Sequence, residues 1–416
     1  MSTLIDFLAV VARASTLLIH SVLNAVSRKR SSEDHGRRIK SQLRSNSFSG
    51  NLPVELISEI LRHLHHHEMT LRSCSLVCSA WTPLSRYHLF YRIYLNHSNA
   101  SAFVALLQSD SGPSIGAFVR QLTIYRELSH APWLLHVLPI VSSYIRPTSL
   151  FLNLQNSLYR DFDSGILPIY KEDLSIFRHV FRETVKLILS LDCDTFAEGV
   201  QVVCAFPLLE TLELHSDWYL GLKSHVPSDT LCLPSRLRSI ACFQGGSPFF
   251  LWLLSQPHPP PVSRVFLRDI YVTDTVRLYI QTLGANLEHL TFEPNFHQST
   301  KSADHRSLDI SENHRLRSIV FHSQADVISA ACHLLSQVRS TDIEKVEIGL
   351  SKHAFPSTHL ADLEPPEEWS RLDTLLSTPQ FSKLWELKVT IPWCSPREIG
   401  RLLPLSKVRG ILCVPI

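Results

Sequence analysis

A short apolar pattern that returns along most of the chain constrains the fold more than any other feature of the sequence. Between residues 118 and 416, apolar side chains recur at positions one, four and six of a short segment. The first residues of consecutive clear copies are 25 to 29 positions apart. These copies are Leu209-Leu212-Leu214, Leu237-Ile240-Cys242, Val262-Val265-Leu267, Leu287-Leu290-Phe292, Leu316-Ile319-Phe321 and Ile343-Val346-Ile348. A unit of this length cannot bury its apolar face alone, so neighbouring units must stack.

The pattern extends in both directions in a weaker form. Later copies are Leu384-Leu387-Val389 and Val408-Ile411-Cys413, and an earlier copy is Val119-Leu122-Ile124. Ser149-Leu152-Leu154 and Thr184-Leu187-Leu189 fit in their last two positions only. The spacing resembles the Leu-x-x-Leu-x-Leu core of leucine-rich repeats, although the Asn or Cys expected three residues later is mostly missing. The resemblance implies an irregular solenoid of the α/β class, with parallel strands and outer helices.

Helical patterns occupy the segments between the strands. One helix is expected from Asp274 to Leu283, with Gly284 as its C-terminal cap. Another is expected to open at Ser323, with Asp326 completing a capping box. Its apolar stripe has a period of 3.6 residues and comprises Val327, Ile328, Ala331, Leu334, Leu335 and Val338. The Pro-Pro-Glu-Glu-Trp segment at 365–369 falls in a longer gap between repeats and is interpreted as an inserted loop.

Residues between the core positions of a repeat are expected on the inner, concave face of the solenoid. The candidates for binding a protein substrate are Arg264, Phe266, Arg268, His289 and Lys345. A basic and aromatic surface suits an acidic or phosphorylated peptide, because guanidinium groups bind phosphate bidentately. We expect the two arginines and the lysine to occupy equivalent positions of separate repeats and to form a positive stripe. The alternative is that these charges only solvate an exposed face, as most surface charges do.

Residues 52–90 carry short amphipathic helical patterns instead. Pro53 is expected at the first helical position, where its missing N–H costs nothing. Apolar residues then follow at helical spacing, first as Ile57, Ile60, Leu61 and Leu64, and then as Leu71, Cys74, Val77, Cys78 and Trp81. Pro83 interrupts the second stripe, and a third apolar cluster comprises Leu84, Tyr87, Leu89 and Phe90. About forty residues rarely bury a self-sufficient core, so such a segment usually needs a partner.

The order of these residues resembles the F-box: Leu-Pro-x-Glu-Leu first, Leu-Val-Cys-x-x-Trp in the middle and Leu-Phe at the end. Its Cys-Ser-Leu-Val-Cys and Pro-Leu-Ser-Arg variant is similar to fungal F-box proteins. The resemblance implies binding to the adaptor subunit of a cullin–RING (SCF-type) ubiquitin ligase and, through it, to a cullin. By the family pattern, the adaptor-facing candidates are Leu52, Pro53, Leu56, Ile60, Leu76, Val77 and Trp81, although Trp81 could belong to the core. The alternative is that the segment opens a larger domain and that its stripes are all internal.

We expect three parts. Residues 1–50 are an N-terminal apolar helix and a linker, residues 51–95 are an F-box, and residues 100–416 are a leucine-rich-repeat-like substrate-binding domain. Residues 4–26 form an apolar helix, but Asp6 and Arg13 interrupt them. The longest part without a full charge, from Ala14 to Val26, is shorter than the roughly 20 residues that a membrane-spanning helix needs. Residues 27–50 are rich in Ser, Arg and Lys and are interpreted as a disordered, solvated linker. The sequence therefore does not favour a membrane partner.

Composition and motifs argue against several functions. The net charge of +2 is too small to favour a nucleic-acid partner by bulk attraction. The nine cysteines are odd in number and scattered, which fits a reducing compartment, the cytoplasm or the nucleus. The histidines at 65–67 and the pair Cys74 and Cys78 lack the spacing of a structural zinc site. No Walker loop, Gly-x-Ser-x-Gly elbow or dinucleotide fingerprint is present. We expect no metal, no cofactor and no catalysis.

These features predict a substrate-recognition subunit of an SCF-type ubiquitin ligase, in which the F-box binds the adaptor and the repeats bind a protein substrate. The identity of that substrate cannot be read from the repeats. The rival interpretation is a leucine-rich-repeat scaffold outside any ligase, attached to a membrane through the N-terminal helix.

Overall fold

The computed structural model describes residues 53–414, apart from 66, 80, 126–132, 155–175, 178, 192–195, 216–230, 232, 244–246, 271–272, 295–307, 324–326, 351–365 and 392–393. The chain separates into two compact units. The first runs through Ile93 and takes in Asp110–Val119, and the second comprises Tyr94–Ser109 and the chain from Arg120 onward. The expected N-terminal helix and linker lie outside the described residues, as does Leu52. Within the described part, no helix is both long and apolar enough to cross a membrane.

The first unit is a small helical module with a core of its own. Its helices are α2 (Val54–His63), α3 (Glu68–Cys74), α4 (Trp81–Phe90) and α6 (Gly112–Phe118). Ile57, Leu61, Leu71 and Trp81 form the buried centre, and Leu64, Cys74, Cys78, Leu84 and Leu89 pack against it. Helix α6 joins through Phe118, whose ring lies edge-on to Tyr87 with centroids 6.0 Å apart. The helical spacing read from the sequence therefore identifies this core.

The ends of these helices differ from the sequence-based expectation. Pro53 precedes α2 in an extended conformation (ψ 143°), and its carbonyl accepts the N–H groups of Leu56 and Ile57. The second apolar stripe is not one helix, because α3 ends at Cys74 and Val77 lies in the turn that follows. Pro83 does not separate the helices either. It lies in the first turn of α4, where a missing N–H leaves no hydrogen bond unmade.

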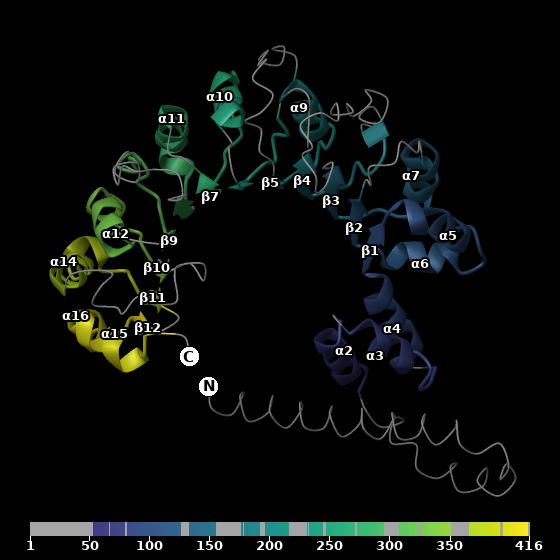
Figure 1. Ribbon diagram of the computed structural model, residues 1–416, viewed down its shortest axis with the longest axis horizontal. Helices are drawn as coiled ribbons and strands as arrows, with labels where there is room; N and C mark the ends of the chain where they lie inside the picture. The colour runs from purple at the N-terminus through teal and green to yellow at the C-terminus, as the bar shows by residue number, and fades with distance from the viewer. Residues whose placement is uncertain are drawn as a thin grey trace, which may run out of the picture. The chain divides into compact units, whose positions relative to one another are not determined.

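The repeats form a parallel sheet whose strands follow one another in chain order from β1 to β12. The strands are β1 (Arg92–Leu95), β2 (Gln121–Tyr125), β3 (Ser149–Leu154), β4 (Lys186–Leu191), β5 (Thr211–His215), β6 (Ser239–Phe243), β7 (Arg264–Ile270), β8 (His289–Pro294), β9 (Ser318–Ser323), β10 (Lys345–Leu350), β11 (Glu386–Thr390) and β12 (Leu412–Cys413). Within the second unit, these strands line the inner side of an arc and the helices lie on its outer side (Figure 1). This is the expected α/β solenoid.

The described outer layer of the second unit consists of helices in the segments between strands. Its helices are α5 (His97–Leu107), α7 (Trp133–Tyr144), α9 (Phe196–Cys204), α10 (Ser247–Ser255), α11 (Asp274–Leu283), α12 (Val327–Ser336), α14 (Pro366–Leu376), α15 (Pro396–Leu402) and α16 (Pro404–Val408), with 3-10 turns at η3 (Gly284–Asn286) and η5 (Pro379–Phe381). Helix α11 has the predicted bounds, with Thr273 as N-cap and Gly284 at φ 49° ending it. The predicted stripe of α12 is buried, and Ser323 is the last residue of β9; Asp326 of the expected capping box lies outside the described residues.

The apolar pattern gives the core of the sheet. Position four of the six clear copies forms one continuous row, in which Val265 pairs with Leu290 and Leu290 with Ile319. These side chains are buried beneath the helices, whereas the alternate residues of each strand lie on the inner face. Position six forms the next buried row, for example Leu267 beside Phe292. The strand alternation predicted from the sequence is confirmed for all six copies.

Three weaker features were assigned wrongly from the sequence. In β3, Leu150 and Leu152 occupy positions four and six, because they pair with Leu122 and Ile124 of β2. In the last copy, Val408 and Cys413 are exposed, and only Ile411 is buried. The described part of the presumed insertion, from Pro366, is the repeat helix α14, and its Trp369 is fully buried. A weak match to a repeat pattern thus fixed neither the register nor the burial.

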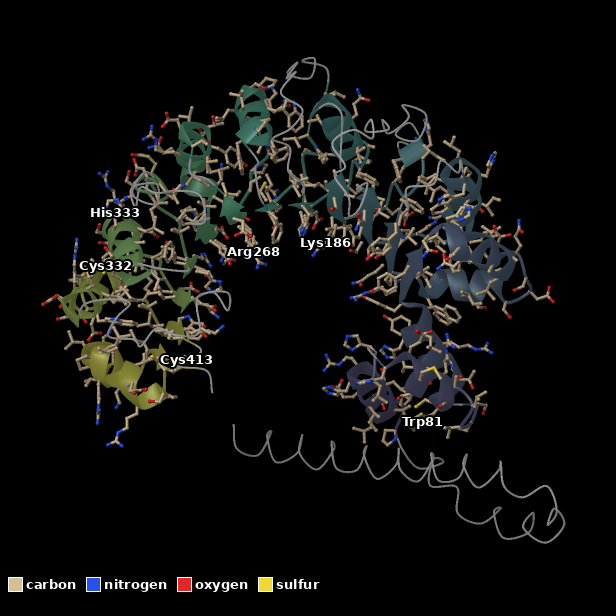
Figure 2. The ribbon with its side chains drawn as sticks, in the orientation of Figure 1. Trp81, Lys186, Arg268, Cys332, His333 and Cys413 are labelled. Atoms are coloured by element: carbon tan, nitrogen blue, oxygen red, sulfur yellow. The ribbon has the colours of Figure 1, made fainter. Side chains whose placement is uncertain are left out.

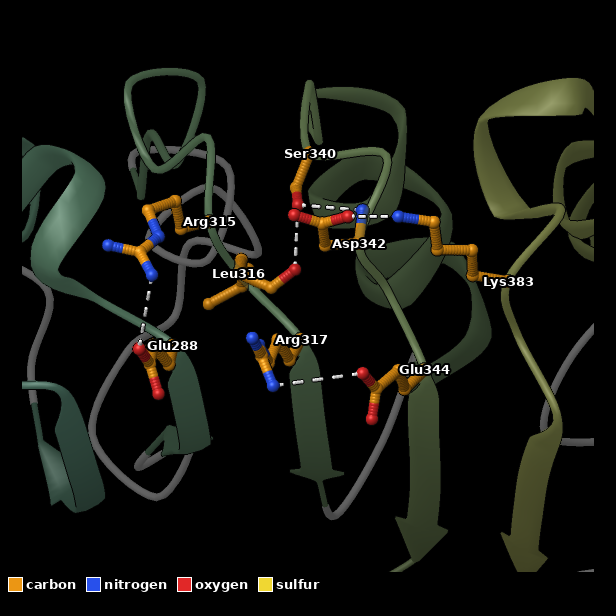
Figure 3. A network of polar contacts seen from close by, with 8 residues as sticks. All are labelled: Glu288, Arg315, Leu316, Arg317, Ser340, Asp342, Glu344 and Lys383. Carbon is orange, nitrogen blue, oxygen red and sulfur yellow. Dashed lines mark hydrogen bonds and ion pairs between the residues drawn. The ribbon is translucent and has the colours of Figure 1, made fainter.

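Polar side chains connect neighbouring repeats just before each strand begins (Figure 3). Arg315 pairs with Glu288 at 4.0 Å, and Arg317 with Glu344 at 3.9 Å. Such exposed pairs add little stability each. The buried hydroxyl of Ser340 donates to the carbonyl of Leu316 at 2.7 Å, so it fixes the spacing of two consecutive repeats.

Candidate protein-binding surfaces

The helical module exposes several of the residues that the F-box pattern assigns to the adaptor. Leu56 is 43% exposed, Leu76 is 86% exposed and Val77 is 41% exposed. Pro53 is exposed, and Ile60 is half-buried. Leu76 and Val77 lie together in the turn after α3, where their N–H groups bond the carbonyls of Ser73 and Cys74. Leu76 and Val77 are therefore two adjacent apolar side chains exposed on a small module.

Trp81 is a correction to the predicted surface. It is only 3% exposed and lies in the module's own core with Leu61 and Leu71. The structure instead exposes two apolar residues that the sequence-based interpretation did not name, Val54 and Met69. Met69 falls off the apolar stripe of α3, whereas Val54 shares a helical face with Ile57 and Leu61 but is the first residue of α2. Asking which apolar residues miss the core stripe would have found Met69 only.

The two cysteines of the module pack against its core, which confirms their interpretation as apolar fillers. Burial raises the pKa of the Cys74 thiol. A raised pKa disfavours the thiolate that zinc binding needs. On the exposed side of α2, Glu59 accepts a hydrogen bond from Arg62 at 2.9 Å, and the neighbouring His63 lies 3.2 Å from the same carboxylate. The polar side of this helix is therefore a solvated face.

The structure places the five predicted substrate-binding residues on the inner face, but not in the predicted arrangement. Arg264, Phe266 and Arg268 are alternate residues of one strand, β7. The two arginines therefore lie in different rows of the same repeat and not at equivalent positions of separate repeats. Register places His289 beside Arg264, then Ser318 on β9 and Lys345 on β10. Figure 2 shows Arg268 on the inner side of the arc.

The cations of this face are largely neutralised by acids of neighbouring strands. Arg268 lies 3.2 Å from Glu293 on β8. Lys345 lies 2.9 Å from Glu386 on β11, and its ammonium sits 4.3 Å from the centre of the Trp385 ring. Two of the three cations of the positive stripe expected from the sequence, Arg268 and Lys345, are thus in cross-strand ion pairs.

The same pairing continues at both ends of the sheet. Lys388 on β11 donates to Glu347 on β10 at 2.7 Å, and Lys186 on β4 lies 2.5 Å from Glu213 on β5. The His215 imidazole and the Lys186 ammonium lower the pKa of the Glu213 carboxyl. Glu213 therefore stays ionised at neutral pH and balances the charge of Lys186.

A row of aromatic rings crosses the inner face from β1 to β7. We call it the aromatic row, and it comprises Tyr94, Tyr125, Phe151, His215, Phe243 and Phe266. Along the row, consecutive ring centroids are 6.4, 6.1, 6.5, 4.0 and 5.2 Å apart. At its far end the Arg268 guanidinium lies 5.9 Å from the centre of the Phe243 ring. Of the six residues of the aromatic row, the sequence-based interpretation had named only Phe266.

The rings lie over small residues of the same face. Thr123, Ser190 and Ala241 alternate with the core positions and yet are buried. Ser190 stands on β4, the strand between Phe151 and His215, and its hydroxyl donates to the His215 carbonyl at 3.1 Å. A small residue there leaves room for these two rings to approach each other across it. The rings themselves are only partly buried, and Tyr94 is half-exposed.

Comparison with known proteins supports the identification of the helical module. Residues 49–96 match the family model described as F-box-like. Among solved structures, the chain is similar to the leucine-rich repeat-containing protein LegL7 from Legionella pneumophila, with 13% identity and a TM-score of 0.41, over 71% of this chain and 94% of that chain. No curated protein matches the chain. F-box modules are typically protein-interaction modules.

Proposed function

We propose that this chain is the substrate-recognition subunit of a cullin–RING (SCF-type) ubiquitin ligase. The observation that carries the proposal is the F-box-like match at residues 49–96, on a module that exposes Leu76 and Val77 while burying a core of its own. The adaptor subunit would cover these side chains together with Pro53, Leu56 and Ile60. Through the adaptor the chain would join a cullin.

The repeat sheet would hold the substrate. A receptor of this kind performs no chemistry. It raises the effective concentration of a substrate lysine near the ubiquitin-charged enzyme. The proposal places the chain in the cytoplasm or the nucleus, where such a ligase would meet its substrates.

The proposal is tested by measuring adaptor binding to the full-length chain with isothermal titration calorimetry. We expect Leu76→Asp with Val77→Asp to weaken binding strongly, because anchors at an interface centre are worth about 2 kcal/mol or more each. Leu278→Asp is the matched control, since Leu278 is also an exposed leucine but lies on α11 of the other unit. Equal affinity of the double variant and the control would contradict the proposed surface.

The rival function, a scaffold outside any ligase, is distinguished by the cullin. Purification of the full-length chain from cells should recover both the adaptor and a cullin, and the Leu76→Asp, Val77→Asp variant should recover neither. Recovery of membrane components without a cullin would favour the scaffold.

A further inference from the structure

We propose that the aromatic row is the docking surface for an extended segment of a partner protein that carries uncharged apolar side chains at alternate positions. The inference rests on the proposed function, because it names the class of substrate segment that the repeat sheet would hold. It replaces the acidic or phosphorylated peptide suggested by the sequence, since two of the three cations expected to bind such a peptide, Arg268 and Lys345, are paired within the sheet.

The spacing of the rings fits an extended chain. Over the first four rings, from Tyr94 to His215, the centroids are 6.4, 6.1 and 6.5 Å apart. An extended chain rises about 3.3 Å per residue, so its alternate side chains are about 6.6 Å apart. A segment laid across the strands can therefore place one side chain against each of these rings. Neighbouring strands are about 4.8 Å apart, so the path from β1 to β7 is about 29 Å long and accommodates about nine residues.

The charges that border the row favour an uncharged occupant. Lys186 already pairs with Glu213, and Arg268 with Glu293, at 2.5 and 3.2 Å. A carboxylate or phosphate of the partner would have to compete with these acids. A cation of the partner would meet Arg268 already lying over the Phe243 ring. At these two ion pairs the partner's charge would lose hydration without gaining a free counter-charge.

The partly exposed rings provide apolar surface that such a segment can bury. The rings are partly exposed, whereas Thr123, Ser190 and Ala241 of the same face are buried. They are held from below by the sheet and from the side by one another, so little conformational entropy is lost when a partner covers them. Rigid aromatic anchors of this kind dominate the affinity of many protein interfaces.

The test uses the full-length chain and a phage library of random peptides, each about twelve residues long so that the roughly nine-residue path is covered. Enriched peptides are then synthesised with a fluorescent label and their dissociation constants measured by polarisation. We expect apolar residues at alternate positions, and binding about 30-fold weaker to the variant Tyr125→Ala, Phe243→Ala. Val320→Ala is the matched control, because Val320 is an apolar inner-face residue on β9, beyond the end of the aromatic row. It should bind as the wild type does.

Several outcomes would overturn the inference. One is a set of enriched peptides without apolar residues at alternate positions. Another is a set of peptides that bind the Tyr125→Ala, Phe243→Ala variant as tightly as the Val320→Ala control. A third is a set of acidic peptides whose binding depends on Arg264. A fourth is an oligothymidine that displaces the peptides from the wild type and binds only when Phe243 is present. That result would assign the aromatic row to single-stranded nucleic acid, whose bases also stack on aromatic side chains. Melting temperatures of the variants check that each remains folded.

Adaptor affinity measured on the same preparations separates this inference from the proposed function. If the adaptor binds and the peptides do not depend on the aromatic row, the inference fails alone. If the peptides depend on the row and the adaptor does not bind, the proposed function fails while the peptide-binding surface stands.

Discussion

Gly349 shows how one residue shapes the charged half of the inner face. It stands on β10 beside His322 of β9, and a Cβ atom there would come within 2.5 Å of the imidazole Cδ2. The absence of a side chain lets the His322 ring lie over the strand, with its Nε2 3.5 Å from Glu347. Glu347 also accepts the hydrogen bond from Lys388, so one glycine makes room for a three-residue contact across β9, β10 and β11.

We therefore expect Gly349→Ala to lower the free energy of unfolding by about 1 kcal/mol, at the low end of overpacking costs because the imidazole can swing toward solvent. Chemical denaturation measures this cost. The same substitution made in a His322→Ala background should be close to neutral, because the clashing ring is gone. An equal loss in both backgrounds would show that the methyl group disturbs the backbone and not the ring.

At the scale of the strand, the sequence is sufficient to predict which side chains are buried where apolar core residues alternate with residues of the inner face. Leu287-Leu290-Phe292 and the other clear copies were placed correctly, because a period of two residues decides which side chains meet the helices. The copy at Ser149 was misread because β3 carries apolar residues on both faces, with Phe151 between Leu150 and Leu152. Alternation then no longer distinguishes the core face from the inner face.

Contacts between strands could not be predicted in the same way. The aromatic row joins Phe151 on β3 to His215 on β5, which neither pair with each other nor occupy one row. Their contact depends on how the rings lean over Ser190, and no pattern within a single strand carries that information. The same holds for Arg268, whose acidic partner Glu293 becomes its neighbour only when β7 pairs with β8.

Adjacent residues of one strand should respond in opposite ways to a charge. Leu290 is buried against the helices, whereas Thr291 stands on the inner face of the same strand. Leu290→Asp should lower the free energy of unfolding by about 3 kcal/mol or more, because it buries an unpaired carboxylate. Thr291→Asp should change it by about 0.5 kcal/mol, as surface substitutions do. Circular dichroism melting of the two variants checks this difference, and the reverse order would contradict the assigned faces.

At the scale of the whole molecule, the two units have separate cores and, by our proposals, separate partners. The helical module is built around Leu61, Leu71 and Trp81, whereas the sheet is built on rows that run from repeat to repeat. A module of this size buries a smaller fraction of its surface than a larger domain does, so it is only marginally stable. Such a module can fold more firmly when its partner binds, because a ligand of the folded state stabilises it by mass action.

Differential scanning calorimetry of the full-length chain should therefore show separate transitions for the module and the sheet. Leu71→Ala should lower the transition of the module, since a cavity at this position costs about 2–5 kcal/mol, and should leave the transition of the sheet unchanged. Leu290→Ala, at an equally buried leucine of the sheet, should do the reverse. Added adaptor should raise only the transition that Leu71→Ala lowers. If Leu71→Ala lowers both transitions together, the two cores unfold as one, and binding at one surface would then also stabilise the other.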